Sequence, residues 1–134
     1  MDLLNNAEFR LMETALDAFT LRHRVTVNNI ANGDTPRFKR SQVQFEELLN
    51  EATERQTIVG RRTDPRHIPI GEQSESVTAK VVTDNTTLMN NNLNNVDIDY
   101  EMSRLAENQL RYNVVVQQVN YAIKHMKTAI GGGR

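Results

Sequence analysis

The sequence predicts a mainly α protein whose two long helices, one near each end, pack as a coiled-coil-like pair. Two observations predict this fold. Apolar residues recur near both ends with alternating steps of four and three, which is the heptad pattern of helices that pack side by side. The segment between them is rich in Ser, Thr and Asn and shows no sustained period. We therefore expect a mostly irregular middle region with one short β element.

The first long helix is expected over residues 6–32. Its apolar ladder consists of Phe9, Met12, Leu16, Phe19, His23, Thr26 and Ile30. Gly33 is predicted to end the helix in the left-handed conformation, and Pro36 would prevent the helix from resuming. We expect a loop over 33–42, a short amphipathic helix over 45–52 and a short strand over 77–83.

The second long helix is expected to begin near Asp97, whose side chain can cap the first turn. Gly131 to Gly133 would end it. Its ladder consists of Ile98, Met102, Leu105, Gln109, Tyr112, Val116, Val119, Ile123, Met126 and Ile130. A second stripe, formed by Ala106, Leu110, Val114 and Tyr121, runs beside it. A helix that is apolar on more than one side is usually buried by more than one neighbour.

These elements divide the chain into residues 1–32, 33–95 and 96–134. The ladders predict an assembly interface, with the terminal helices packing on each other or on copies and partners. Its predicted residues are Phe9, Met12, Leu16, Phe19, Ile30, Ile98, Met102, Leu105, Tyr112, Val116, Val119, Ile123 and Met126. A single domain wrapping its own C-terminal helix is the alternative, but little of the remaining chain is available to wrap it.

The composition limits the other functions. The 134 residues suit one domain, and the net charge of −1 gives no electrostatic basis for binding nucleic acid or an anionic membrane. The chain has no cysteine, which excludes disulfides and thiolate ligands. The first residues lack the features of a secretory signal, and no apolar stretch is long enough to span a bilayer.

No grouping of residues indicates an enzyme, a metal site or a cofactor. His23 could serve as a metal ligand, but a lone histidine on a helix interface is usually packed or hydrogen-bonded. Helix capping explains Asp97 and Asp99 better than metal binding does. Arg37, Lys39 and Arg40 flank Phe38, yet acidic residues follow closely and no nucleic-acid motif is present.

Residues 28–39 carry the most specific motif of the chain. This junction motif contains Asn28, Asn29, Ile30, Ala31, Asn32, Gly33, Thr35, Pro36, Phe38 and Lys39. It resembles the signature of the bacterial flagellar rod and hook proteins, in which a helix ends in Asn-Ile-Ala-Asn before Thr-Pro-Gly-Phe/Tyr-Lys. Further stretches at 15–18, 63–68, 94–99, 106–112 and 127–132 are similar to the proximal rod proteins of that family. Arg37 stands where the family usually has Gly, so we expect ordinary dihedral angles there or a new polar contact.

The resemblance implies a structural subunit of the flagellar basal body. Members of the family form a tube that crosses the periplasm, transmits torque and surrounds an export channel. The implied partners are copies of the chain, other rod proteins, a FliE-type adaptor and the membrane ring at the base, and the type III export apparatus, which exports such subunits without a cleaved signal peptide. The alternatives are another axial rod component or a helical export adaptor or chaperone, which would form a stable soluble dimer.

Overall fold

Two long helices and a small two-stranded sheet make up the described part of the chain. The computed structural model describes residues 7–47, 49–50, 78–86 and 93–132. In chain order the elements are α1 (Ala7–Ala31), β1 (Ser41–Gln44), β2 (Lys80–Thr83) and α3 (Ile98–Ile130). The mainly α prediction is confirmed, and so is the expected packing of the two long helices against each other.

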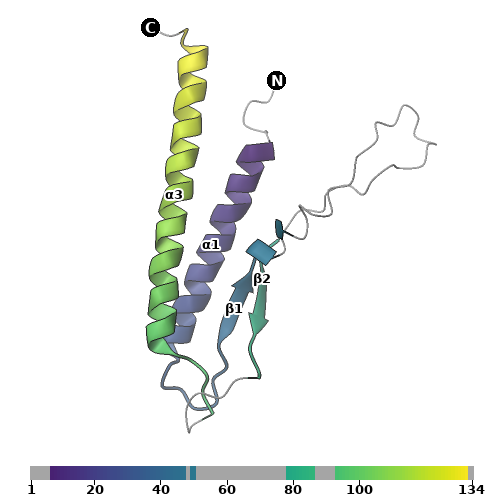
Figure 1. Cartoon of the computed structure of the whole chain (residues 1–134), viewed down its shortest axis with the longest axis vertical. Coiled ribbons are helices and arrows are strands. Elements are labelled where there is room, and N and C mark those ends of the chain that lie inside the picture. The colour runs from purple at the N-terminus through teal and green to yellow at the C-terminus, as the bar shows by residue number, and fades with distance from the viewer. Residues whose placement is uncertain (1–6, 48, 51–77, 87–92, 133–134) are drawn as a thin grey trace, which may run out of the picture.

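The helices α1 and α3 lie side by side and antiparallel, so that the first turn of α1 and the last turn of α3 lie toward the same end of the molecule (Figure 1). Residues 7–31 of the predicted first helix are helical, and Asn6 lies outside the described residues. Because α3 has 33 residues and α1 has 25, α3 is longer by about 12 Å. The C-terminal end of α3 therefore extends beyond α1 (Figure 1).

Local capping sets the ends of α3 as the sequence predicts. The Asp97 side chain accepts a hydrogen bond from the Tyr100 amide and caps the first turn. At the other end the Gly131 amide donates to the Lys127 carbonyl, and Gly132 takes a positive φ of 70°. Only glycine adopts that conformation without strain, so the glycines end the helix.

The sheet is an antiparallel ribbon that packs on α1. Ser41 pairs with Thr83 and Gln44 with Lys80. The expected strand is confirmed over Lys80–Thr83, with Val77 outside the described residues. The strand β1 was not predicted, since 33–42 was expected to be a loop. Helical residues follow β1 at 46–47 and 49–50, which agrees with the first part of the helix expected over 45–52; residues 51–52 are not described.

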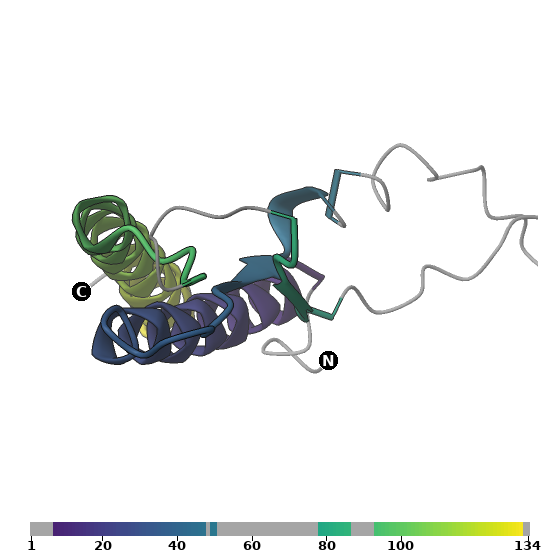
Figure 2. The same cartoon turned by 90° about the horizontal axis from the view of Figure 1, so that it is seen from below.

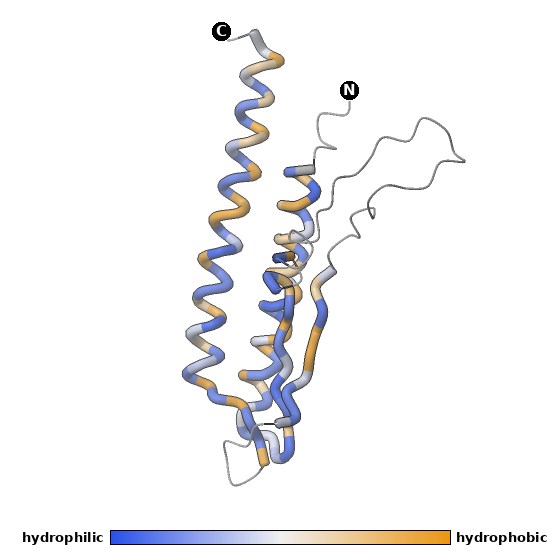
Figure 3. Tube along the Cα trace, turned by 45° about the vertical axis from the view of Figure 1, so that its right-hand side comes forward, coloured by the Kyte–Doolittle hydropathy of each residue, from blue (hydrophilic) through white to orange (hydrophobic). Residues whose placement is uncertain are grey.

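The apolar core is small, and its residues come from α1, from β1 and the residue after it, and from the segment before α3. Viewed along the helices, α3 and the ribbon contact different sides of α1 (Figure 2). The buried apolar residues are Ala18, Phe19, Val43, Phe45 and Val96. Along α3, apolar residues continue to recur well beyond this core (Figure 3). Burial of a common core therefore explains only part of the apolar pattern of α3.

Candidate assembly site

The junction motif folds the chain sharply from α1 into β1, and the Asn29 side chain holds the two together. Asn29 Nδ2 donates to the Ser41 carbonyl at 2.7 Å, and the Ser41 amide donates to Asn29 Oδ1 at 3.0 Å. The side-chain amide thus pairs with Ser41 as a neighbouring strand would. Asn29 Nδ2 also donates to Glu101 Oε2 at 3.1 Å. One side chain of the motif therefore links α1, β1 and α3.

A buried asparagine before α3 holds the turn that follows α1. Asn94 is 0% exposed, and its Nδ2 lies 2.9, 2.8 and 2.8 Å from the carbonyl oxygens of Asn32, Gly33 and Thr35. Its Oδ1 accepts a hydrogen bond from the Val96 amide at 2.7 Å. Two N–H groups thus serve three carbonyls, while the same side chain fixes the segment that enters α3.

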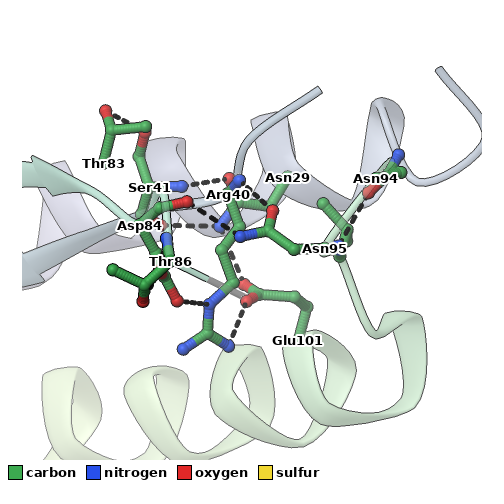
Figure 4. A network of polar contacts seen from close by, with 10 residues as sticks. Asn29, Arg40, Ser41, Thr83, Asp84, Thr86, Asn94, Asn95 and Glu101 are labelled. Atoms are coloured by element: carbon green, nitrogen blue, oxygen red, sulfur yellow. Dashed lines mark hydrogen bonds and ion pairs between the residues drawn. The ribbon is translucent and has the colours of Figure 1, made fainter. Parts of the chain in front are cut away.

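The next asparagine joins the start of β1 to the end of β2 (Figure 4). Asn95 Oδ1 accepts from the Arg40 amide at 2.7 Å, and Asn95 Nδ2 donates to the Asp84 carbonyl at 2.8 Å. The Arg40 guanidinium lies 3.8 Å from Asp84 Oδ2 and 3.7 Å from Glu101 Oε1. We call Asn29, Arg40, Asn94, Asn95 and Glu101 the polar clamp. Their side chains bring all described elements together at the junction end.

The structure corrects the predicted conformation of two junction residues. Gly33 has no positive φ, so the left-handed stop predicted there is wrong. A Cβ at Gly33 would instead lie 2.9 Å from Ile98 Cγ1 and Cδ1, which makes close packing the reason for glycine. Arg37 has a φ of 62°, so the ordinary dihedral angles expected there are also wrong. The left-handed residue of this turn is Arg37.

Glu46 ties the segment after β1 to both helices. Its carboxylate accepts from Arg22 of α1 in a two-pronged ion pair, and Oε1 also accepts from Arg111 Nη1 of α3 at 2.9 Å. The hydrogen bonds from Arg22 lower the pKa of the Glu46 carboxyl below its ordinary value of 4.5, with further lowering by the charge of Arg111 and opposition from burial. The ion pair thus fixes where the middle region leaves the helix pair.

The predicted ladder residues occupy two kinds of place. Of those on α1, Phe19 is buried, while Phe9, Met12, Leu16 and Ile30 are half-buried. Of those on α3, the half-buried residues are Leu105, Tyr112, Val116, Val119, Ile123 and Met126. Ile98 and Met102 are exposed. The ladder on α3 is thus exposed in the first turns, while most of its residues from Leu105 onward are half-buried.

Several polar residues of the two helices are buried. Glu101 and Asn108 are the buried residues of α3, and Arg22 is buried on α1. Asn108 Nδ2 donates to the Phe19 carbonyl at 3.0 Å, while its Oδ1, also buried, has no hydrogen-bond partner among the residues that the structure describes. These positions were missed because a heptad pattern marks apolar residues. Glu101 and Asn108 are one residue away from the ladder positions Met102 and Gln109.

Two uncovered apolar surfaces remain on α3. The second stripe of the sequence analysis is exposed at Leu110, Val114 and Tyr121, each more than half accessible. On another side, a groove of about 190 Å³ opens between the helices. It is lined by Phe19, Thr20, His23, Asn108, Gln109 and Tyr112. His23, a ladder residue of α1, is thus part of the groove lining and is exposed.

Neither feature resembles a catalytic or metal site. Within the described residues, no three His, Cys, Asp or Glu side chains are grouped so that they could hold a metal ion. Over the same part of the chain, no helix is both long and apolar enough to cross a membrane. The two helices are joined internally by the polar clamp and carry apolar surfaces on the outside. Such surfaces suit protein–protein interaction.

Comparison with known proteins identifies the family. No protein-family model matches the chain. The flagellar basal body rod protein FlgB of Bacillus subtilis (strain 168) is 35% identical over 123 residues, which cover 92% of each chain. The chain belongs to the FlgB family of flagellar basal body rod proteins. FlgB of Borreliella burgdorferi is 37% identical over 112 residues, 79% of this chain and 83% of the relative. FlgB of Escherichia coli (strain K12) is 27% identical over 136 residues, 96% of each.

Membership of the FlgB family makes the chain a structural component of the flagellar basal body rod and not an enzyme. As a rod component it assembles with other rod components of the basal body. The sequence similarity covers both helices and the junction motif, since matches extend over more than nine tenths of the chain.

Proposed function

We propose that the chain builds the proximal rod by packing its terminal segments, 1–32 and 96–134, into the inner helical layer of a tube around the export channel. The observation that carries this proposal is the exposed apolar stripe of α3 at Leu110, Val114 and Tyr121. Large apolar side chains that recur on one exposed helix face mark a protein interaction surface. The predicted interface residues on the half-buried side of α3 would form the edges of this interaction surface.

The free end of α3 supports the same proposal. Beyond the reach of α1, the half-buried Ile123 and Met126 and the exposed Ile130 continue the ladder. A helix gains most of its stability from packing an apolar face on a neighbour. Neighbouring subunits would supply that packing, and many such contacts around a tube would carry torque.

A subunit of the proximal rod lies at the base of the rod, and this position determines the partners and the location that we expect for the chain. We expect contacts with copies of the chain, with other rod proteins, and with a FliE-type adaptor and the membrane ring. We also expect export by the flagellar type III apparatus without a cleaved signal peptide, and a final position in the part of the rod that spans the periplasm. The apolar surfaces of α3 and the junction motif are the proposed contact regions.

The test adds one charge to the exposed stripe without disturbing the monomer. Val114→Glu replaces an exposed side chain by a good helix former, so the free energy of unfolding of the monomer should change by less than about 0.5 kcal/mol. Burial of the same charge in an assembled rod would cost roughly several kcal/mol at every subunit. We expect cells carrying this variant to lose rods and swimming, as seen by electron microscopy of basal bodies.

Gln42→Glu is the matched control because it adds the same charge at an exposed residue of β1. Cells with this variant should assemble rods and swim. Detection of the wild-type chain in isolated basal bodies by mass spectrometry completes the test. Normal rods with Val114→Glu, or absence of the chain from basal bodies, would contradict the proposal.

A further inference from the structure

Two exposed stripes of α3 have the same residue spacing. Within the second stripe, the three large residues Leu110, Val114 and Tyr121 follow the pattern i, i+4, i+11. The first stripe, which we define as Ile98, Met102 and Gln109, follows the same pattern exactly 12 residues earlier. At about 100° per residue, each set covers only about 40° of the helix. The chain thus carries two matching stripes, one displaced from the other along the same helix.

Both stripes are available to a neighbour. Their apolar members are between 43% and 68% exposed, and Gln109 is also exposed. Neither stripe contains a charged residue. A shift of 12 residues turns the helix by about 120°, so the stripes face different directions. They are therefore able to contact two different neighbours at the same time.

The groove contains a hydrogen-bond acceptor that could pair with a donor at the end of the second stripe. It adjoins Gln109 at the end of the first stripe, and Asn108 beside it is only 3% exposed. In the described part of the chain, the Asn108 Oδ1 atom has no hydrogen-bond partner, and a buried acceptor of this kind favours a donor from a neighbouring molecule. Tyr121, at the corresponding end of the second stripe, carries an apolar ring with a hydroxyl donor at its tip.

We propose that the second stripe of one copy packs along the first stripe of the next copy, with the two α3 helices parallel and displaced by 12 residues. The displacement corresponds to about 18 Å along the helix axis. Leu110 then meets Ile98, Val114 meets Met102, and Tyr121 enters the groove beside Gln109. This inference rests on the proposed function and specifies how copies of the chain contact each other.

Three features of the chain favour a second copy over a different protein. One constant displacement aligns all three pairs at once. The uncharged stripes are compatible with each other. The displacement also places the free end of one α3, which extends beyond α1 (Figure 1), beside the α1–α3 pair of its neighbour. Because the two contacting surfaces differ, the interface is heterologous and repeats from copy to copy, as a tube requires.

Cysteine cross-linking tests the register, since the chain has no cysteine of its own. The in-register variants are Met102→Cys/Val114→Cys and Gln109→Cys/Tyr121→Cys. Within one helix, residues 12 apart are about 18 Å distant and cannot form a disulfide. Helices packed 8–10 Å apart bring facing Cα atoms to about 4–6 Å, which is within disulfide range. Any disulfide therefore joins two copies.

The variants are expressed as the sole copy in motile cells, and basal bodies are isolated and oxidised. Each in-register pair should give a ladder of multimers on a non-reducing gel. The single-cysteine variants and the off-register pair Met102→Cys/Tyr121→Cys should give none. Two in-register pairs are used so that failure of one variant to assemble leaves the other as the test.

The outcomes separate this inference from the proposed function. Cells that swim and contain rods but give no ladder would overturn the register while leaving the chain a rod subunit. Dimers formed by a single cysteine would overturn it as well, because only a two-fold contact joins identical residues. A ladder from the off-register pair as strong as that from the in-register pairs would refute the 12-residue displacement.

Discussion

Removing the Asn94 side chain should destabilise the fold more than any other single asparagine change. In Asn94→Ala, the Val96 amide and the Gly33 carbonyl lose the side-chain partners that they have now. The carbonyls of Asn32 and Thr35 retain backbone partners in the turn. At about 1–3 kcal/mol for each unsatisfied buried group, the expected loss is about 2–6 kcal/mol in the free energy of unfolding.

The Asn94→Asp variant tests the same contact by its pH dependence. A carboxylate there would face three carbonyl oxygens without a proton to donate, so burial and repulsion would raise the pKa of the new carboxyl in the folded state. A raised folded-state pKa means that the folded state binds the proton more tightly. The loss of stability should therefore be smallest below about pH 3.9 and grow as the pH rises through the folded-state pKa.

Urea unfolding followed by far-UV circular dichroism measures both variants. Asn28→Ala is the control, because Asn28 is exposed in the last turn of α1 and alanine favours the helix. That variant should change stability by less than about 0.5 kcal/mol. A loss below about 1 kcal/mol for Asn94→Ala, or a loss for Asn94→Asp relative to the wild-type chain that does not grow with pH, would show that Asn94 does not hold the junction.

Three further changes test the junction and the ion pair. Gly33→Ala should cost about 1–3 kcal/mol of unfolding free energy because its Cβ would lie 2.9 Å from Ile98 side-chain atoms and 3.3 Å from the Ile30 carbonyl oxygen. Adding Ile98→Ala should recover part of that loss, and an additive double mutant would contradict the contact. Arg37→Gly should raise the thermal midpoint slightly or leave it unchanged, since glycine adopts the φ of 62° without strain; a clear loss of stability would indicate a specific contact of Arg37. The lowered pKa of Glu46 means that its ion pair stabilises the fold above pH 4.5 and is lost as the pH falls through the folded-state value. Glu46→Gln should therefore weaken the decline of the thermal midpoint below pH 4.5, and an unchanged decline would refute this.

The helices were predictable because their signals are local. The Asp97 side chain caps α3 by accepting a hydrogen bond from the amide three residues later, and the glycines after Ile130 end the helix within one turn. The strand β1 lacks such a signal. It has four residues, of which only Val43 is buried, and its partner begins at Lys80, far along the chain. Pairing across that separation and the side chain of Asn29 define the strand.

Sequence reasoning named Gly33 correctly but for the wrong reason, and it missed Asn94. Steric contact with Ile98 depends on how α3 returns to the end of α1, which no local pattern reveals. Asn94 and Asn95 lie in a run of asparagines that suggests only a turn. Asn94 donates to backbone carbonyls, and Asn95 accepts from a backbone amide, that lie more than 50 residues away in the chain.

There is a physical cause for the burial of Glu101 in place of its neighbour Met102 on the apolar ladder. At the junction end, β1 lies beside the helices, and the backbone groups at its edge require polar partners. Asn29 meets that requirement at Ser41 and also donates to the buried Glu101. With Glu101 turned inward, Ile98 and Met102 are exposed. The clamp that fixes the monomer thus also exposes the first stripe. On this account, the same polar contacts that stabilise one copy leave an apolar surface free for the next.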